Sequence, residues 1–208
     1  PLVEPLFELA PLAPTLPEFD ALAFTSANGV RRFAELSARR DMPAWCVGAA
    51  TGQAARAAGF ADVRASDGDV EALIVRLRRE LAADMRLLHA GNIEAIGDLA
   101  RRLQDQGFQA EFAAVYGPLD LPAGPALAAH LAGEAAFEAV LIHSPRAARL
   151  LAAHLAKAAR AAPFRLAAIS AKAAAPLTPF AEQAAIAAAP DEGALAAALE
   201  EVLAPLSS

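Results

Sequence analysis

The chain has 208 residues and a mass of 21.4 kDa, a length that fits one large domain or two domains of roughly 100 residues each. Hydrophobic residues make up 56% of the chain, which excludes intrinsic disorder because enough apolar surface is present to offset the entropy of ordering. The net charge of -6 argues against a non-specific nucleic-acid binder, and no apolar stretch reaches the length of about 18 residues that would indicate a membrane span. We therefore expect a cytoplasmic protein without nucleic-acid or membrane partners.

Short apolar runs alternate with helical periodicity through the first half of the chain. Val30, Phe33 and Leu36 share one face of a predicted helix. Asp67 or Asp69 can serve as the N-cap of a later helix. Strands are predicted at 22–25, 43–47, 63–65, 86–89 and 110–116, and helices at 27–40, 51–58, 70–83 and 93–106.

The composition changes at residues 117–125, which contain three prolines and two glycines. Such a segment is typical of a linker between domains. The alternation then resumes, with strands predicted at 139–143, 164–169 and 184–188, and helices at 126–131, 146–161, 171–176 and 192–203. Alternating strands and helices predict an α/β fold with parallel sheets and right-handed crossovers.

The two halves of the chain resemble each other. Residues 24–33 and 142–151 both read as a strand, a serine at its carboxyl end and then a helix, and residues 47–51 match residues 168–172 in the same way. This similarity predicts two related domains, each with a doubly wound parallel sheet.

Small and hydroxyl-bearing residues follow several predicted strands. Ligands of open α/β sheets bind beyond the carboxyl ends of the strands, where the N–H groups of helix starts suit anions. Each serine or asparagine at such a position can equally be an ordinary N-cap. The residues at these positions are Thr25, Ser26, Gly48, Thr51, His89, Gly91, Asn92, Ser144 and Ser170.

The common sequence signatures of nucleotide binding, serine hydrolysis and zinc proteolysis are absent. The four histidines have no metal-ligand spacing, although His89 and His143 end strands and could either pack there or reach a ligand. The single cysteine, Cys46, excludes a disulfide framework and is expected in the core. Tyr116, the only tyrosine, could act as a general acid or simply pack at a hinge between domains.

Six short motifs, in order along nearly the whole chain, together resemble the uroporphyrinogen-III synthase family. Each motif is weak by itself, and their ordered combination carries the resemblance. They are FTSANGV at 24–30, VGAAT at 47–51, LHAGN at 88–92, VY at 115–116, HSP at 143–145 and AIS at 168–170.

The resemblance implies two α/β domains joined by a two-stranded linker. One domain would be contiguous at residues 7–121, and the other would combine residues 1–6 with 122–208. Family members begin with a strand and a helix ahead of the segment that matches Leu2–Leu6. We therefore expect the second domain to lack these two elements and to expose two unpaired strand edges.

The resemblance also implies a reaction and a set of site residues. The family cyclises and dehydrates hydroxymethylbilane, a linear tetrapyrrole with eight carboxylates, to uroporphyrinogen III, with inversion of ring D and without a metal or cofactor. Tyr116 would be the catalytic residue. The chain would act as a monomer on this small-molecule substrate. The substrate-binding positions would be Thr25, Ser26, Ala27, Gly48, Thr51, Gly91, Asn92, Ser144 and Ser170.

Two further points follow from the resemblance. Some family members place a threonine where this chain has Ala173, after Lys172, which would remove one hydroxyl from the site. The alternative to the synthase is a non-enzymatic, two-lobed domain that binds or senses polycarboxylates or other small molecules. Such a domain would share the fold but would not convert hydroxymethylbilane.

Overall fold

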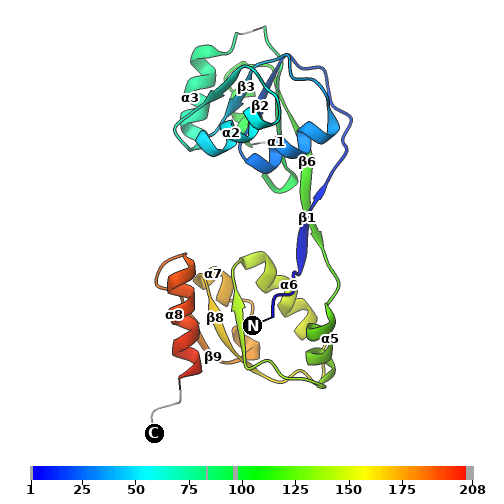
Figure 1. Cartoon of the computed structure of the whole chain (residues 1–208), viewed down its shortest axis with the longest axis vertical. Helices are drawn as coiled ribbons and strands as arrows, with labels where there is room; N and C mark the ends of the chain where they lie inside the picture. Colours follow the sequence, from blue (N-terminus) through cyan, green and yellow to red (C-terminus); the bar gives the residue numbers. More distant parts are fainter. Residues whose placement is uncertain (1, 83, 96–97, 205–208) are drawn as a thin grey trace. The chain divides into compact units, whose positions relative to one another are not determined.

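The computed structural model describes residues 2–82, 84–95 and 98–204 (Figure 1). The chain forms two compact units. One comprises Leu9–Pro118, and the other combines the start of the chain up to Glu8 with the part described from Leu119 onward. The domain limits expected from the sequence, between residues 6 and 7 and between residues 121 and 122, stay a prediction. No helix in the described residues is long and apolar enough to cross a membrane.

The core of the Leu9–Pro118 unit is built on a sheet of six described strands, in the order β1-β6-β5-β2-β3-β4. The five strands from β6 to β4 are mutually parallel. The sheet as a whole is mixed, because β1, one of the two strands of the expected linker, adds an antiparallel strand at the edge of the predicted parallel sheet. The strands are β1 (Phe7–Pro11), β2 (Ala21–Phe24), β3 (Ala44–Cys46), β4 (Val63–Ala65), β5 (Leu87–Asn92) and β6 (Ala110–Asp120).

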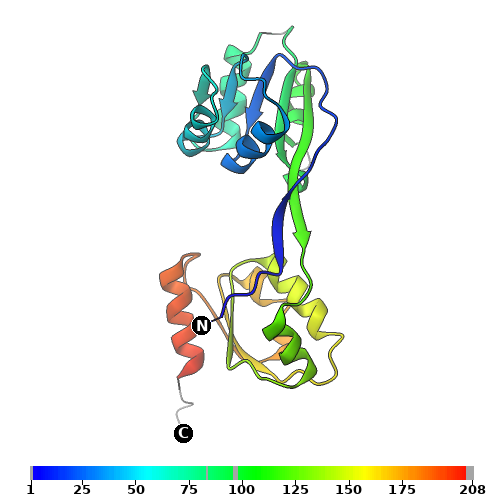
Figure 2. The same cartoon turned by 45° about the vertical axis from the view of Figure 1, so that its right-hand side comes forward.

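The edge strand β1 runs beside β6, and both strands pass from one unit to the other (Figure 2). The amide of Leu12 donates to the carbonyl of Val115 at 3.0 Å, and that of Leu121 donates to the carbonyl of Leu6 at 2.9 Å. One strand's numbers rise as the other's fall, so the pairing is antiparallel. The two-stranded connection expected between the halves is therefore present.

Helices cover both faces of this sheet, and alternate strand residues supply the two cores. Leu22 and Phe24 pack with α1 and α2, whereas Ala21 and Ala23 pack with α3 and α4. The polar carboxyl ends of the strands are thereby held at one edge of a rigid, buried sheet. The helices are α1 (Ala27–Leu36), α2 (Ala49–Ala57), α3 (Val70–Glu80) and α4 (Asp98–Gln104), with a short 3-10 turn, η1 (Ile93–Ala95), before α4.

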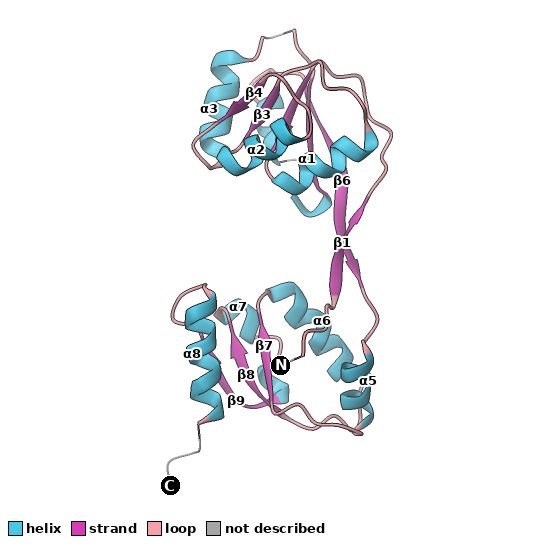
Figure 3. Cartoon of the chain, in the orientation of Figure 1, coloured by secondary structure: helices cyan, strands magenta, loops and turns pink. Residues whose placement is uncertain are grey.

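The second unit contains a parallel sheet of three described strands in the order β7-β8-β9 (Figure 3). Phe164, Leu166 and Ala168 of β8 face the core with α5, α6 and α7, while Ala167 faces α8. The elements are α5 (Pro125–Ala132), β7 (Ala139–Ile142), α6 (Pro145–Leu155), β8 (Phe164–Ala168), α7 (Ala171–Ala174), η2 (Thr178–Phe180), β9 (Ala181–Ile186) and α8 (Glu192–Leu203).

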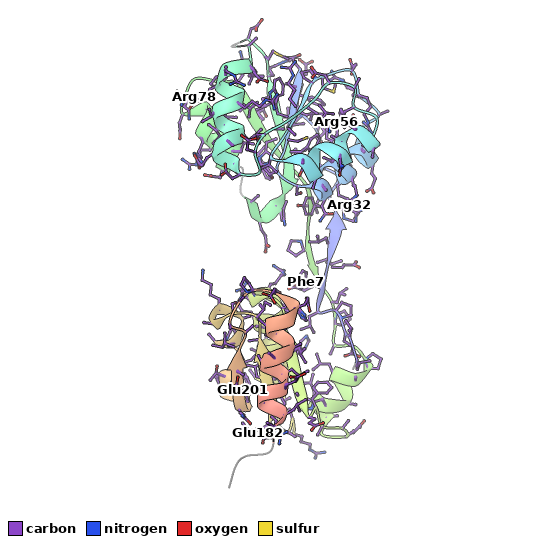
Figure 4. All side chains as sticks on the ribbon, turned by 60° about the vertical axis from the view of Figure 1, so that its left-hand side comes forward. Phe7, Arg32, Arg56, Arg78, Glu182 and Glu201 are labelled. Carbon is purple, nitrogen blue, oxygen red and sulfur yellow. The ribbon has the colours of Figure 1, made fainter. Side chains whose placement is uncertain are left out.

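The start of the chain is fastened to the second unit by side chains. The carboxylate of Glu4 accepts hydrogen bonds from the backbone amides of Ala126 and Leu127, at 2.8 and 2.9 Å, and so caps the first turn of α5. The guanidinium of Arg146 lies over the ring of Phe7, which Figure 4 labels, with 5.4 Å to the ring centroid. Residues more than a hundred positions apart in the chain are thus joined within this unit.

Several predicted boundaries differ from the structure. β6 continues to Asp120, through the predicted linker residues Gly117 and Pro118, because pairing with β1 extends it. The predicted helix at 93–106 is replaced by η1 and α4, with residues 96–97 outside the described part. Helix α3 ends at Glu80, whereas the prediction ended it at Ala83, a residue outside the described part of the chain.

Helix α1 ends at Leu36 rather than at the predicted Arg40. The Arg40 guanidinium donates to the carbonyls of Ala34, at 3.1 Å, and Ser37, at 2.7 Å. It also reaches the carbonyl of Ala58, at 2.7 Å, just after α2. The Arg40 side chain therefore satisfies carbonyls at the ends of both α1 and α2. The chain leaves the α1 axis after Leu36, and this turn brings Arg40 back to the helix end.

Candidate functional site

The carboxyl ends of β2 and β5 bring two predicted site positions together in the Leu9–Pro118 unit. The strands are parallel neighbours, with Ala23 opposite His89. Directly after β2, the hydroxyl oxygen of Thr25 lies 3.2 Å from Nε2 of His89. Strand alternation places both side chains on the face of the sheet that α3 and α4 cover.

A second hydrogen bond joins Ser26 to Tyr116, whose hydroxyl oxygens are 2.9 Å apart. Ser26 is the N-cap of α1, and its Oγ accepts from the amide of Gly29 at 3.1 Å. Tyr116 is 6% exposed and belongs to the core with α1 and α2. It lies in the middle of β6, so the expectation that it ends a strand is wrong.

Close packing of α1 on β5 permits this geometry. A Cβ at Gly29 would lie 2.8 Å from the carbonyl oxygen of Ala90, so only glycine lets the helix start approach the strand this closely. The pairing of β5 with β6 shifts register between Gly91 and Asn92, where Asn92 comes opposite Tyr116. These local features bring the phenol within reach of the start of α1.

His89 is buried, with only 2% of the residue exposed. Burial lowers its pKa to about 4, so the ring is neutral at pH 7. The ring lies beside Phe112, with 5.1 Å between centroids. Its Nδ1 atom is buried and has no hydrogen-bond partner among the described residues.

Gly48 and Thr51 lie at the start of α2. Gly48 is the N-cap and offers no side-chain hydrogen bond, and a Cβ there would come 3.0 Å from the Cα of Gly68. Thr51, in the first turn, is 5% exposed. The backbone at the start of this helix thus lies close to the loop between β4 and α3, while the Thr51 side chain belongs largely to the interior.

Gly91 and Asn92 belong to β5, which continues past His89, where the predicted strand ends. The side-chain oxygen of Asn92 accepts from the amide of Glu94 at 3.0 Å and stabilises the 3-10 turn η1 that follows. The described part of the next helix, α4, begins at Asp98. The longer strand takes up residues 90–92, which the sequence prediction left between the strand at 86–89 and the helix at 93–106.

Ser144 and Ser170 belong to the second unit, where each is an N-cap. The hydroxyl of Ser144 accepts from the amide of Ala147 at 3.1 Å and starts α6, and that of Ser170 accepts from Ala173 at 3.3 Å and starts α7. These are the N-cap roles that the sequence left open as an alternative. Each cap uses the hydroxyl as an acceptor, so its hydrogen stays available to a ligand.

The remaining candidates have other surroundings. His143 is exposed and lies 3.4 Å from the carboxylate of Glu192. Cys46 is a core residue, as expected, and burial raises the pKa of its thiol to about 11.

Among the described residues no group of three His, Cys, Asp or Glu side chains could hold a metal. One surface hollow, lined among others by Glu18, Arg86 and Gln109, contains none of the predicted site residues.

Sequence reasoning found most of these positions and missed how they pair. The sequence predicts that His89 ends a strand and either packs there or reaches a ligand, but it cannot name Thr25 as its partner because the order of the strands is not in the local pattern. Strand parity was the available signal, since His89 and Thr25 fall on one face once β2 and β5 are neighbours.

Fold and site together define a two-unit α/β protein with hydroxyl groups at strand ends and helix starts. A family model, uroporphyrinogen-III synthase HemD, matches residues 1–197. The chain therefore belongs to the uroporphyrinogen-III synthase family.

One solved structure agrees with this assignment at the level of the fold. The chain is similar to the crystal structure of uroporphyrinogen-III synthetase from Helicobacter pylori 26695, with a TM-score of 0.62, 17% identity, and coverage of 94% of this chain and 90% of that one. It also matches uroporphyrinogen III synthase from the extremely thermophilic bacterium Thermus thermophilus, with a TM-score of 0.41, 20% identity, and coverage of 88% and 76%. Comparison with curated protein sequences gives no match.

Proposed function

We propose that the chain is an active uroporphyrinogen-III synthase, which cyclises and dehydrates hydroxymethylbilane to uroporphyrinogen III with inversion of ring D. The family match supports the reaction class. The observation that carries the proposal is the 2.9 Å hydrogen bond between Ser26 and Tyr116, because it joins a phenol to a helix start within one unit. A cytoplasmic, monomeric enzyme is part of the proposal.

Substrate binding would rely on dipoles and hydroxyl groups rather than on a cluster of cations. Hydroxymethylbilane carries eight carboxylates, and the N–H groups of helix starts favour anions without adding net positive charge. This fits a chain whose net charge is -6. The proposed contacts are Thr25, Ser26, Ala27, Gly48, Thr51, Gly91, Asn92, Ser144 and Ser170.

The first chemical step is loss of the hydroxyl group from the hydroxymethyl carbon. The electron pair of the adjacent pyrrole nitrogen drives cleavage of the C–O bond, and Tyr116 gives its proton to the departing oxygen, which leaves as water. The Ser26 hydroxyl can accept a hydrogen bond from the Tyr116 phenol or donate one to it. The Gly29 amide donates to the Ser26 oxygen and holds it in place. The proposal requires no metal or cofactor, since the pyrrole supplies the electrons.

Ring closure then has to follow the inverting route. Direct closure gives the type I isomer, whereas attack at the substituted carbon of ring D gives a spirocyclic intermediate that leads to type III. A site that fixes the two chain ends in one geometry favours the second route by orientation alone. The ratio of the two isomers therefore reports on positioning separately from rate.

The test is turnover of hydroxymethylbilane by the purified chain, followed by oxidation and chromatographic separation of the uroporphyrin isomers. Type III product, formed faster than the spontaneous type I background, is the expected result. A chain that binds uroporphyrin III but leaves only type I product would instead be the non-enzymatic polycarboxylate-binding domain. A chain that does neither would contradict both.

A further inference from the structure

The buried imidazole of His89 has one hydrogen-bond partner and one ring nitrogen without any. Nε2 lies 3.2 Å from the hydroxyl oxygen of Thr25. Nδ1 is buried and has no partner in the part of the chain that the structure describes. A buried polar atom without a partner destabilises a fold, so a histidine at this position calls for an explanation.

The two neutral tautomers leave different atoms unsatisfied. With the hydrogen on Nδ1, a buried N–H donor would have no acceptor, which is the rarer and more costly arrangement. With the hydrogen on Nε2, that atom donates to Thr25, and only a lone pair on Nδ1 stays unpaired. The geometry favours the second tautomer.

The tautomer decides what the Thr25 hydroxyl can do. An oxygen that accepts from His89 cannot also give its own hydrogen back along the same bond, so that hydrogen is directed elsewhere. Thr25 is half-buried, directly after β2 and before the N-cap of α1, whereas His89 is almost fully buried. The free hydrogen can therefore meet a ligand that the imidazole itself cannot touch.

Neighbouring residues fix the orientation of the His89 imidazole. Phe112 lies on one side, with 5.1 Å between ring centroids. A Cβ at Gly91 would lie 3.1 Å from Nε2 and 3.3 Å from the Phe112 ring, so the absence of a side chain there makes room for the ring. The orientation of the donor toward Thr25 is thus set by packing.

We propose that His89 is a positioning residue, whose Nε2–H donates to Thr25 and so leaves the Thr25 hydroxyl to donate to a substrate carboxylate. This inference rests on the proposed function, in which Thr25 contacts the polycarboxylate substrate. His89 acts only through Thr25 and touches no reacting atom.

Nuclear magnetic resonance tests the tautomer without any ligand. In a long-range proton–nitrogen spectrum of the nitrogen-15-labelled protein at pH 7, we expect the His89 signals to show a neutral ring with the hydrogen on Nε2. The His89→Gln variant assigns the signals, because they vanish from the spectrum of that variant. A hydrogen on Nδ1, or a doubly protonated ring, would overturn the proposal.

Affinity for uroporphyrin III, measured by fluorescence, tests the coupling. His89→Leu and Thr25→Val should each weaken binding about fivefold, as expected for one lost hydrogen bond. His89→Gln, whose amide can replace the Nε2–H donor, should bind within about twofold of the wild type. The double variant with both His89→Leu and Thr25→Val should bind no more weakly than Thr25→Val alone.

The outcomes separate this inference from the proposed function. If wild type makes type III product but the effects of His89→Leu and Thr25→Val multiply, or if His89→Gln is as weak as His89→Leu, His89 has only a structural role and the inference is wrong. If wild type neither binds uroporphyrin III nor turns over hydroxymethylbilane, the proposed function fails and the substrate part of the inference fails with it. The spectrum still decides whether His89 orients Thr25.

Discussion

The hydroxyl oxygens of Ser26 and Tyr116 lie 2.9 Å apart, although 90 positions separate the two residues in the chain. Ser26 caps a helix, and Tyr116 comes from the middle of an eleven-residue strand. Ser26 caps α1 and also holds the phenol of Tyr116. It therefore links the stability of the start of α1 to the position of the candidate acid. The two roles can be separated by mutation.

Tyr116→Phe should lower the rate of type III formation by about 10- to 100-fold, because the leaving group loses its proton donor but retains the push of the pyrrole nitrogen. Folding should change little, since the ring remains in the core. Ser26→Ala is the comparison, because it keeps the phenol but removes the N-cap and should also lower the melting temperature. Equal rates for Tyr116→Phe and wild type would leave Tyr116 a packing residue.

Gly29→Ala should reduce the free energy of unfolding by about 2 kcal/mol, since the new methyl group would meet the Ala90 carbonyl and push α1 away from β5. Gly193→Ala is the matched control in α8, where the added Cβ makes an ordinary 3.4 Å contact with Asp191. It should stabilise by about 0.5 kcal/mol. Urea denaturation measures both, and a neutral Gly29→Ala would contradict the close approach.

Acid should destabilise the protein in part through His89. The unfolded ring takes up a proton near its ordinary pKa of 6.5, whereas the folded ring does so only near 4. The stabilisation is therefore complete above pH 6.5 and is lost as the pH falls toward 4, by about 3 kcal/mol in total. The measurement is the difference in unfolding free energy between wild type and His89→Gln across this range, which cancels the other titrating groups. A difference that does not change with pH would contradict a buried neutral ring.

Arg40→Met should lower the free energy of unfolding by about 2 kcal/mol, because carbonyls at the ends of α1 and α2 lose a charged donor together. The control is Arg78→Met, which removes an exposed charge on α3 (Figure 4). That control should change stability by less than about 0.5 kcal/mol. Equal effects for the two variants would show that the Arg40 bonds contribute nothing beyond charge.

The Cys46 thiol should resist alkylation in the native state, because it is fully buried and its pKa is raised to about 11. Labelling with a thiol reagent at pH 8 should occur only when the Leu9–Pro118 unit opens. The labelling rate should therefore rise with urea in step with unfolding. Fast labelling of the folded protein would place Cys46 outside the core.

Much of the fold follows from sequence periodicity, since regular elements arise from local patterns. The bounds of β4 and α8 agree with the prediction to the residue. The errors fall where distant partners decide the local structure. β6 runs past Tyr116 because β1 pairs with it, and α1 stops early because Arg40 folds back over its end.

The candidate site shows the same division. A serine before a helix and small residues at strand ends can be recognised from the sequence, because capping and turn chemistry are local. The hydrogen bonds between Thr25 and His89 and between Ser26 and Tyr116 depend on the order of the strands, which no local pattern contains. The substrate-binding and catalytic roles themselves stay predictions.

The Glu4 carboxylate that caps α5 has a consequence for synthesis on the ribosome. Glu4 is made more than 120 residues before its partners, the amides of Ala126 and Leu127. The Leu9–Pro118 unit, which is continuous in the chain, can fold as soon as it has emerged, whereas the first eight residues have to wait. A nascent chain halted when Pro118 has left the tunnel but Ala126 has not should therefore present a protease-resistant Leu9–Pro118 body, while the residues up to Glu8 stay open to cleavage.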